Sequence, residues 1–169
     1  NTHKMSYGHG LFFCGEKTGA CMLAASAALH FGIGLVTVFG APVPTAPFDF
    51  MYTLHLPENF SAAMVGSGLG RSVDAQARAL DFLSQELVRE RPLILDADIL
   101  HNLELPKLLP LLKKPILTPH PKEFQRLLAH SGLAQVSVAE IQEHRFEYLR
   151  LFCGAFPHAV TILKGAYPL

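Results

Sequence analysis

Short apolar runs alternate with longer amphipathic segments along the whole chain, a pattern typical of alternating strands and helices. The predicted strands are residues 11–14, 35–39, 50–56, 62–65, 93–95, 116–117 and 159–163. The predicted helices are residues 19–31, 74–89, 121–128 and 138–152. Several strand segments are apolar at consecutive positions, and strands of that kind are buried on both faces. The pattern therefore predicts an α/β fold with a mostly parallel sheet covered by helices on both faces.

Size and charge narrow the class of protein. The chain has 169 residues, of which 50% are hydrophobic and 17% charged, so it has the length of one domain and the composition of a globular one. Lys plus Arg and Asp plus Glu both number 14, which gives a formal net charge of +0, and no basic run occurs. A nucleic-acid partner would need a basic surface, so we expect none.

One long uncharged stretch has to be tested as a membrane span. No Asp, Glu, Lys or Arg lies between Lys17 and Asp49. Gly32 and Gly34 interrupt this stretch, and residues 35–39 are strand-like, so we predict a buried helix followed by a buried strand. We expect no membrane association. The chain shows no signal-peptide pattern. Its three cysteines lie in apolar runs, which predicts reduced core residues in a cytoplasmic protein.

A glycine-rich loop follows the predicted strand at 62–65. It contains Gly66, Gly68 and Gly70 and precedes a predicted helix. Glycines let backbone N–H groups approach a ligand closely, and a helix N-terminus favours anions. The spacing matches neither the dinucleotide fingerprint nor a P-loop. The loop is either a ligand contact or a tight turn, and its place between strand and helix favours the ligand.

Other polar residues also follow predicted strands, where ligands bind in parallel sheets. Asp96 and Asp98 either orient a ligand or Mg²⁺, or cap the helix that begins near residue 99. His120 lies between two prolines, either presented for binding or incidental in a surface turn. Lys164 beside Gly165 suits a phosphate, although this motif taken alone favours an ordinary solvated lysine.

The ordered set of these motifs resembles the ADP/ATP-dependent NAD(P)H-hydrate dehydratases across essentially the whole chain. The segments that carry the resemblance are residues 1–4, 7–10, 18–20, 34–38, 66–70, 95–98, 117–123 and 163–166. The resemblance implies a ribokinase-like fold over residues 1–169 and nucleotide-driven removal of water from hydrated NADH or NADPH. In many bacteria this domain follows an epimerase domain. Because the chain starts at Asn1 and stops after a strand-like run, we expect it to be part of a longer polypeptide.

The same resemblance assigns provisional roles to residues. Ala20, Gly68, Gly70 and His120 would contact the hydrated dinucleotide. Residues 164–166 (Lys164, Gly165 and Ala166) would line the phosphates of ADP or ATP. Asp96 and Asp98 would orient ligand or Mg²⁺. The general base, an aspartate in a Gly-Thr-Gly-Asp motif, is expected to follow Leu169.

The chain departs from the family pattern in places. The loop 15–20 is shorter than usual, Ser67 stands where proline is usual, and Lys122 where glycine is usual. Because fold does not fix function, two alternatives remain. One is a small-molecule kinase of the same fold, and the other is a non-catalytic nucleotide-binding module. A homo-oligomer is expected from the apolar content.

Overall fold

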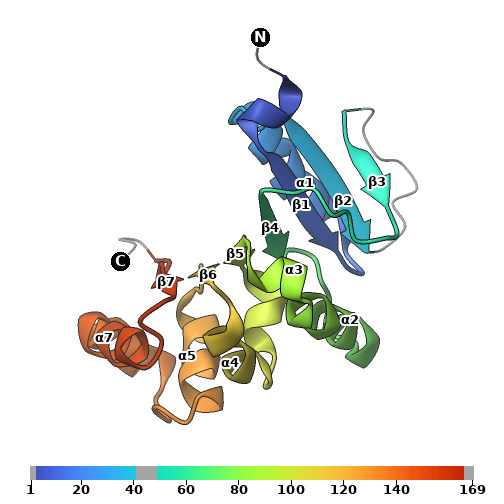
Figure 1. The fold of residues 1–169 in the computed structure, drawn as a ribbon. Helices are drawn as coiled ribbons and strands as arrows, with labels where there is room; N and C mark the ends of the chain where they lie inside the picture. Colours follow the sequence, from blue (N-terminus) through green and yellow to red (C-terminus); the bar gives the residue numbers. More distant parts are fainter. Residues whose placement is uncertain (1–2, 41–48, 166–169) are drawn as a thin grey trace.

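A computed structural model describes residues 3–40 and 49–165. Its centre is one parallel sheet of seven strands in the order β3-β2-β1-β4-β5-β6-β7 (Figure 1). The strands are β1 His9–Cys14, β2 Leu35–Gly40, β3 Met51–Thr53, β4 Ala62–Val65, β5 Pro92–Leu95, β6 Lys114–Leu117 and β7 Val160–Thr161. All carboxyl ends therefore meet at one edge of the sheet. The predicted α/β fold with a parallel sheet is confirmed.

Helices connect these strands. They are α1 Thr18–His30, α2 Val73–Ser84, α3 Glu86–Arg89, α4 Leu105–Leu108, α5 Pro121–His130, α6 Val138–Glu143 and α7 Arg145–Ala155. Three short 3₁₀ segments are η1 Lys4–Tyr7, η2 Ala97–His101 and η3 Leu109–Leu111. Helices α2, α4, α5 and α7 lie along one side of the sheet, and α1 packs against β1 and β2 on the other (Figure 1).

Strand β1 shows how the apolar pattern builds two cores. All six of its residues are buried. Leu11 and Phe13 join the larger core beneath α2 and α5, while Phe12 and Cys14 join the smaller core beneath α1. Successive strand residues point to opposite faces, so a strand that is apolar at every position is explained by helices on both sides.

Helix α1 is less buried than the uncharged stretch suggested. Only Cys21 and Ala25 are buried in it, and Leu23 is 73% exposed. The prediction of a buried helix is therefore wrong, because among the described residues only one face of α1 meets the sheet. The strand predicted after it is confirmed as β2. Among residues 3–40 and 49–165, no helix is both long and apolar enough to cross a membrane.

Two predicted helices are each divided in the structure. The segment 74–89 breaks at Gln85, whose ψ of 134° is extended, and the segment 138–152 breaks at His144, whose φ and ψ are -116° and 40°. Neither break carries a glycine or proline, so sequence patterns gave no sign of it. The predicted strands at 50–56 and 159–163 shorten to β3 and β7 at the two edges of the sheet.

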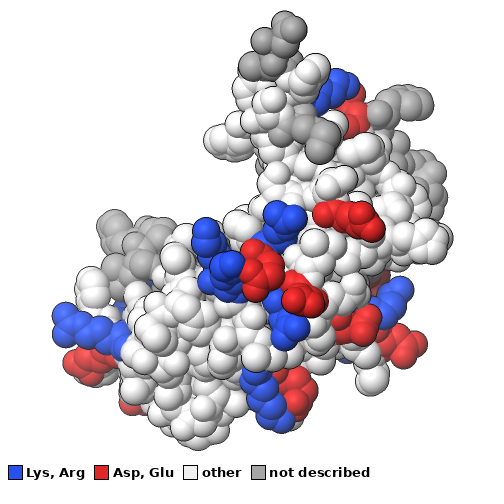
Figure 2. All heavy atoms as spheres, viewed as in Figure 1, with Lys and Arg blue, Asp and Glu red and all other residues white. Residues whose placement is uncertain are grey.

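The surface carries both signs of charge close together. On the face drawn in Figure 2, acidic and basic side chains are interspersed near α3 and the starts of β5 and β6. One such pair is Lys113 Nζ and Glu90 Oε2, 2.6 Å apart. This face has no large patch of a single sign.

Candidate functional site

The glycine loop lies at the carboxyl end of β4. Gly66, Gly68 and Gly70 have φ angles of +117°, +70° and +88°, a region that residues with a Cβ rarely adopt. A Cβ on Gly66 would collide with the backbone of Asp96, and one on Gly68 with the carbonyl of Lys17. The loop therefore needs glycine for its conformation and for close contact with two neighbouring loops.

The loop that follows β1 is joined to the glycine loop by backbone hydrogen bonds. Glu16 N donates to Leu69 O over 3.0 Å, and Lys17 N donates to Gly68 O over 2.9 Å. Ala20, in the first turn of α1, is exposed. Its Cβ lies 3.2 Å from the position that a Cβ on Gly68 would occupy. The structure thus brings together Ala20, Gly68 and Gly70, three of the predicted dinucleotide contacts.

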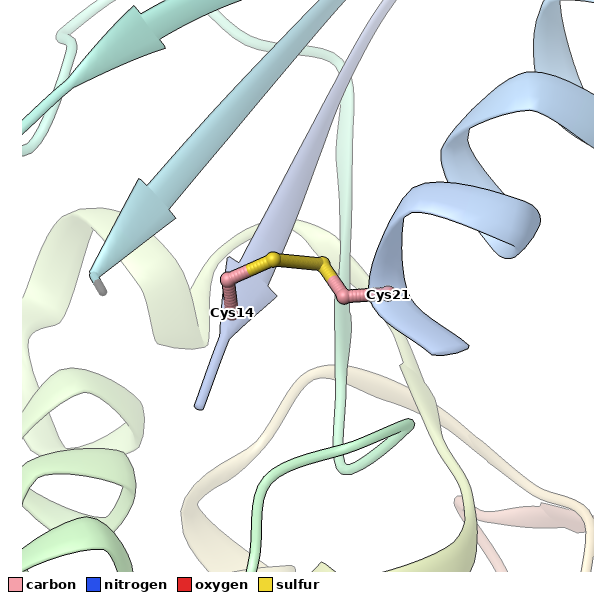
Figure 3. The surroundings of a disulfide bond; sticks show 2 residues. All are labelled: Cys14 and Cys21. Atoms are coloured by element: carbon pink, nitrogen blue, oxygen red, sulfur yellow. A yellow bond between two sulfur atoms is a disulfide. The ribbon is translucent and has the colours of Figure 1, made fainter. Parts of the chain in front are cut away.

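A disulfide bond joins the end of β1 to helix α1. Cys14 at the end of β1 and Cys21 in α1 are bonded, with their Cα atoms 5.6 Å apart (Figure 3). The prediction of reduced cysteines is therefore wrong for this pair. The short loop between them turns the chain back, so two cysteines seven positions apart meet inside the smaller core. Cys153 is free and half-buried.

Asp96 forms hydrogen bonds with three other residues of the site. Its Oδ1 accepts hydrogen bonds from Lys164 Nζ over 2.7 Å and from Thr118 Oγ1 over 2.8 Å, and its Oδ2 accepts one from Ser67 Oγ over 3.4 Å. Burial disfavours the charged carboxylate, but the bonds from Lys164 and Thr118 outweigh it and lower the pKa of Asp96. Asp96 is therefore a carboxylate at neutral pH and joins the ends of β4, β5, β6 and β7.

Asp98 supports the glycine loop. Its Oδ2 accepts from Gly70 N over 3.0 Å, and its Oδ1 accepts from Arg71 Nε over 3.4 Å. Neither Asp98 nor Asp96 caps η2 with its side chain, so the capping alternative is wrong. Between the two aspartates, Ala97 has a φ of 55°, a strained value for a residue other than glycine.

The two aspartates do not form a cation site. Each already bonds a cationic side chain, Lys164 for Asp96 and Arg71 for Asp98. Within the described residues no group of three or more His, Cys, Asp or Glu side chains is arranged to hold a metal ion. The donor set of the described residues thus does not fit Mg²⁺ held by the protein alone.

His120 is fixed by the helix that it opens. It is the N-cap of α5, with Nδ1 accepting from the N–H groups of Lys122 and Glu123, while Pro121 takes the first helical position. Glu123 completes a capping box, because its Oε2 accepts from His120 N over 2.8 Å. Its Oε1 also lies 3.1 Å from His120 Nε2. The position of His120 is therefore fixed by its role as the N-cap of α5, and its side chain remains 46% exposed.

Lys164 follows β7 and lies near both carboxylates. Its Nζ bonds Asp96 and lies 4.0 Å from Glu123 Oε2, yet the side chain is 41% exposed. An ammonium has three protons, so Lys164 can bond Asp96 and still donate to a ligand. Arg145 Nη2 donates to the carbonyl of Leu163 over 3.0 Å and so anchors this segment beside Gly165. Ala166 lies outside the described residues.

Sequence reasoning missed several residues of the site. Glu123, Thr118 and Ser67 contact the predicted residues directly. The three-residue spacing of His120 and Glu123 is the one signal that could have identified a capping box. The partners of Asp96 had no such signal, because Ser67 is 29 and Lys164 is 68 positions away in the chain.

This arrangement of strands places the chain in a known fold class. A ribokinase-like superfamily protein of Enterococcus faecalis matches with a TM-score of 0.65 at 20% identity, covering 99% of this chain and 61% of that one. A hypothetical protein of Streptococcus mutans matches with a TM-score of 0.73 at 23% identity, covering 99% and 63%. The fold is therefore ribokinase-like.

Comparison of sequences assigns the chain to a family within this fold class. The family model described as NAD(P)H-hydrate dehydratase matches residues 11–168. The chain belongs to that family. It is 34% identical to the bifunctional NAD(P)H-hydrate repair enzyme of Helicobacter pylori, over 100% of this chain and 35% of the relative. It is 33% identical to the ADP-dependent (S)-NAD(P)H-hydrate dehydratase of Neisseria meningitidis, over 98% and 58%. The chain thus spans between about a third and three fifths of these relatives.

Proposed function

We propose that the protein removes water from hydrated NADH and NADPH in a reaction driven by ADP or ATP. The observation that carries the proposal is the cluster of Asp96, Thr118 and Lys164 beside the glycine loop, at the carboxyl edge of a parallel sheet. Family membership supports the substrate. ADP is favoured as the nucleotide, since the relatives in Neisseria meningitidis and Bacillus subtilis are named ADP-dependent.

The chemistry follows from the poor leaving ability of hydroxide. In the proposed reaction the hydroxyl oxygen of the hydrated nicotinamide ring attacks the terminal phosphorus of the nucleotide, its proton passes to solvent, and the bond from that phosphorus to the bridging oxygen of the nucleotide breaks. The ring C–O bond then breaks as phosphate leaves, and loss of a proton from the adjacent ring carbon restores the double bond. The base that takes this proton is the aspartate expected to follow Leu169.

The residues of the chain bind and orient in this proposal. Lys164 donates to a nucleotide phosphate, and Asp96 holds the ammonium in place. His120, fixed by Glu123, and the loop containing Gly68 and Gly70 contact the dinucleotide, together with Ala20. Gly165 also lines the nucleotide phosphates in this proposal, and the same role for Ala166 stays a prediction from the sequence. Mg²⁺ remains a proposed cofactor that arrives on the nucleotide phosphates and not on the two aspartates.

The test is recovery of NADH absorbance from purified hydrated NADH by the complete protein, with ADP and with ATP. Lys164→Met should lower kcat/KM by about 10²–10³, because a charge contact to a transferring phosphoryl group is lost. Lys107→Met, which breaks only an exposed pair with Glu104, is the matched control and should leave the rate unchanged.

Product analysis separates the alternatives. A stable phosphorylated alcohol would point to a small-molecule kinase of the same fold, and nucleotide binding without turnover to a binding module. The proposed setting is the cytoplasm as a homo-oligomer, without nucleic-acid or membrane partners. Sedimentation of the complete protein measures the oligomeric state.

A further inference from the structure

A pocket opens beside the glycine loop, between α2, η2 and α5. Its volume is about 660 Å³, within the range of small-ligand sites. Two arginines, Arg71 and Arg126, line it together with His101. The exposed apolar side chains of Val73 and Leu103 lie on its wall, at 83% and 60% exposure. Positive charge beside apolar surface suits a nucleotide better than a bare inorganic anion.

The positive charge of this pocket is only partly compensated. Arg71 donates to Asp98 through Nε and to His101 Nε2 through Nη2, over 3.4 and 3.2 Å. Arg126 is half-buried and makes no hydrogen bond or ion pair with any residue in 3–40 or 49–165. A half-buried guanidinium without a carboxylate favours binding of an anion, and its fork of donors matches phosphate.

His101 adds no charge to the pocket. Burial, with the nearby Arg126 and Arg71, lowers the pKa of His101 to about 4, so the ring is neutral at neutral pH. Because Nε2 accepts from Arg71, the ring proton lies on Nδ1. That atom is buried and lacks a hydrogen-bond partner among the described residues. The ring therefore places no negative charge beside the arginines, and the single donor that it occupies is Nη2 of Arg71.

The pocket is physically continuous with the glycine loop. Arg71 follows Gly70 directly, and Gln76 Nε2 donates to the carbonyl of Gly70 over 2.8 Å. Asn102 Nδ2 in turn donates to Gln76 Oε1 over 2.7 Å, which fixes the orientation of both amides. The glycine loop and the wall of this pocket are thus joined both along the chain and by hydrogen bonds.

We propose that the pocket is a phosphate-binding subsite in which Arg126, aided by Arg71, holds a phosphate group of the hydrated dinucleotide. The identity of the ligand rests on the proposed function, whereas the existence of a phosphate site rests on the pocket alone. The nucleotide that drives the reaction binds apart from it, at Lys164.

The test uses the complete protein and measures binding of NADP⁺ and of ADP by calorimetry. Arg126→Gln should weaken NADP⁺ by about 10- to 100-fold and leave ADP affinity within about twofold, as expected for loss of one charged hydrogen bond. Arg126→Lys keeps the charge and should recover most of the affinity. Arg78→Gln, an exposed arginine on α2 outside the pocket, is the control for a lost charge.

Each outcome decides the proposal. Unchanged NADP⁺ and ADP affinities in a folded Arg126→Gln protein would overturn the subsite, and weakening of ADP alone would overturn its assignment to the dinucleotide. The KM for hydrated NADH should rise with little change in kcat. If the protein dehydrates neither hydrate but NADP⁺ binding depends on Arg126, the proposed function fails and the subsite stands. If the protein dehydrates the hydrates at a rate that does not depend on Arg126, the proposed function stands and the subsite fails.

Discussion

Replacing Glu123 by alanine tests whether one buried side chain stabilises both the fold and the candidate site. The carboxylate is 4% exposed and accepts from His120 N over 2.8 Å, with His120 Nε2 and Lys164 Nζ at 3.1 and 4.0 Å. Glu123→Ala removes the Glu123 half of the capping box and leaves the His120 N–H without its acceptor, at a cost of about 1–2 kcal/mol. We therefore expect Glu123→Ala to lower the free energy of unfolding by about 1–2 kcal/mol.

Urea denaturation followed by circular dichroism measures this loss, and in thermal denaturation the Tm should fall by about 2–8 °C. Glu123→Gln keeps the size and one acceptor, so it should lose about half as much. Glu143→Ala, exposed at the end of α6, is the control and should stay within about 0.5 kcal/mol. A Glu123→Ala protein as stable as that control would refute the reasoning.

Three further outcomes follow from the structure. Gly68→Ala should lower the Tm and weaken dinucleotide binding, because φ at this position is +70° and Lys17 O occupies the space of a Cβ. Stability should fall as the pH drops from about 6.5 toward about 4, since His101 has its pKa lowered to about 4 in the folded protein and its unfolded form takes up the proton first. His101→Asn should flatten that part of the pH profile. A reducing agent should cost about 2–3 kcal/mol, the chain-entropy value for cysteines seven positions apart, and a Cys14→Ala/Cys21→Ala protein should not respond to it.

The central strands could be predicted because their signal is local. Residues 62–65 and 93–95 are short apolar runs, and such runs predict buried strands whatever their neighbours in the sheet are. The breaks at Gln85 and His144 were not predictable, since both residues are compatible with a helix and tertiary packing divides the segments.

The site was predictable as a set of positions and not as a network. Asp96, His120 and Lys164 each follow a strand, and the rule for parallel sheets places them at one edge. Which of them touch depends on the strand order, and that order is decided by packing over long sequence separations. The disulfide was missed because the prediction considered cellular compartment and not the turn that brings Cys14 and Cys21 together.

The disulfide also bears on the thermodynamics of ligand binding. Cys14–Cys21 fixes the end of β1 to the first turns of α1, and the loop between them is hydrogen-bonded to Gly68 and Leu69. Two segments that line the proposed dinucleotide site are thus ordered before any ligand arrives. A ligand there does not lose affinity to the entropy of ordering those loops, and pre-organisation of this kind favours tight binding.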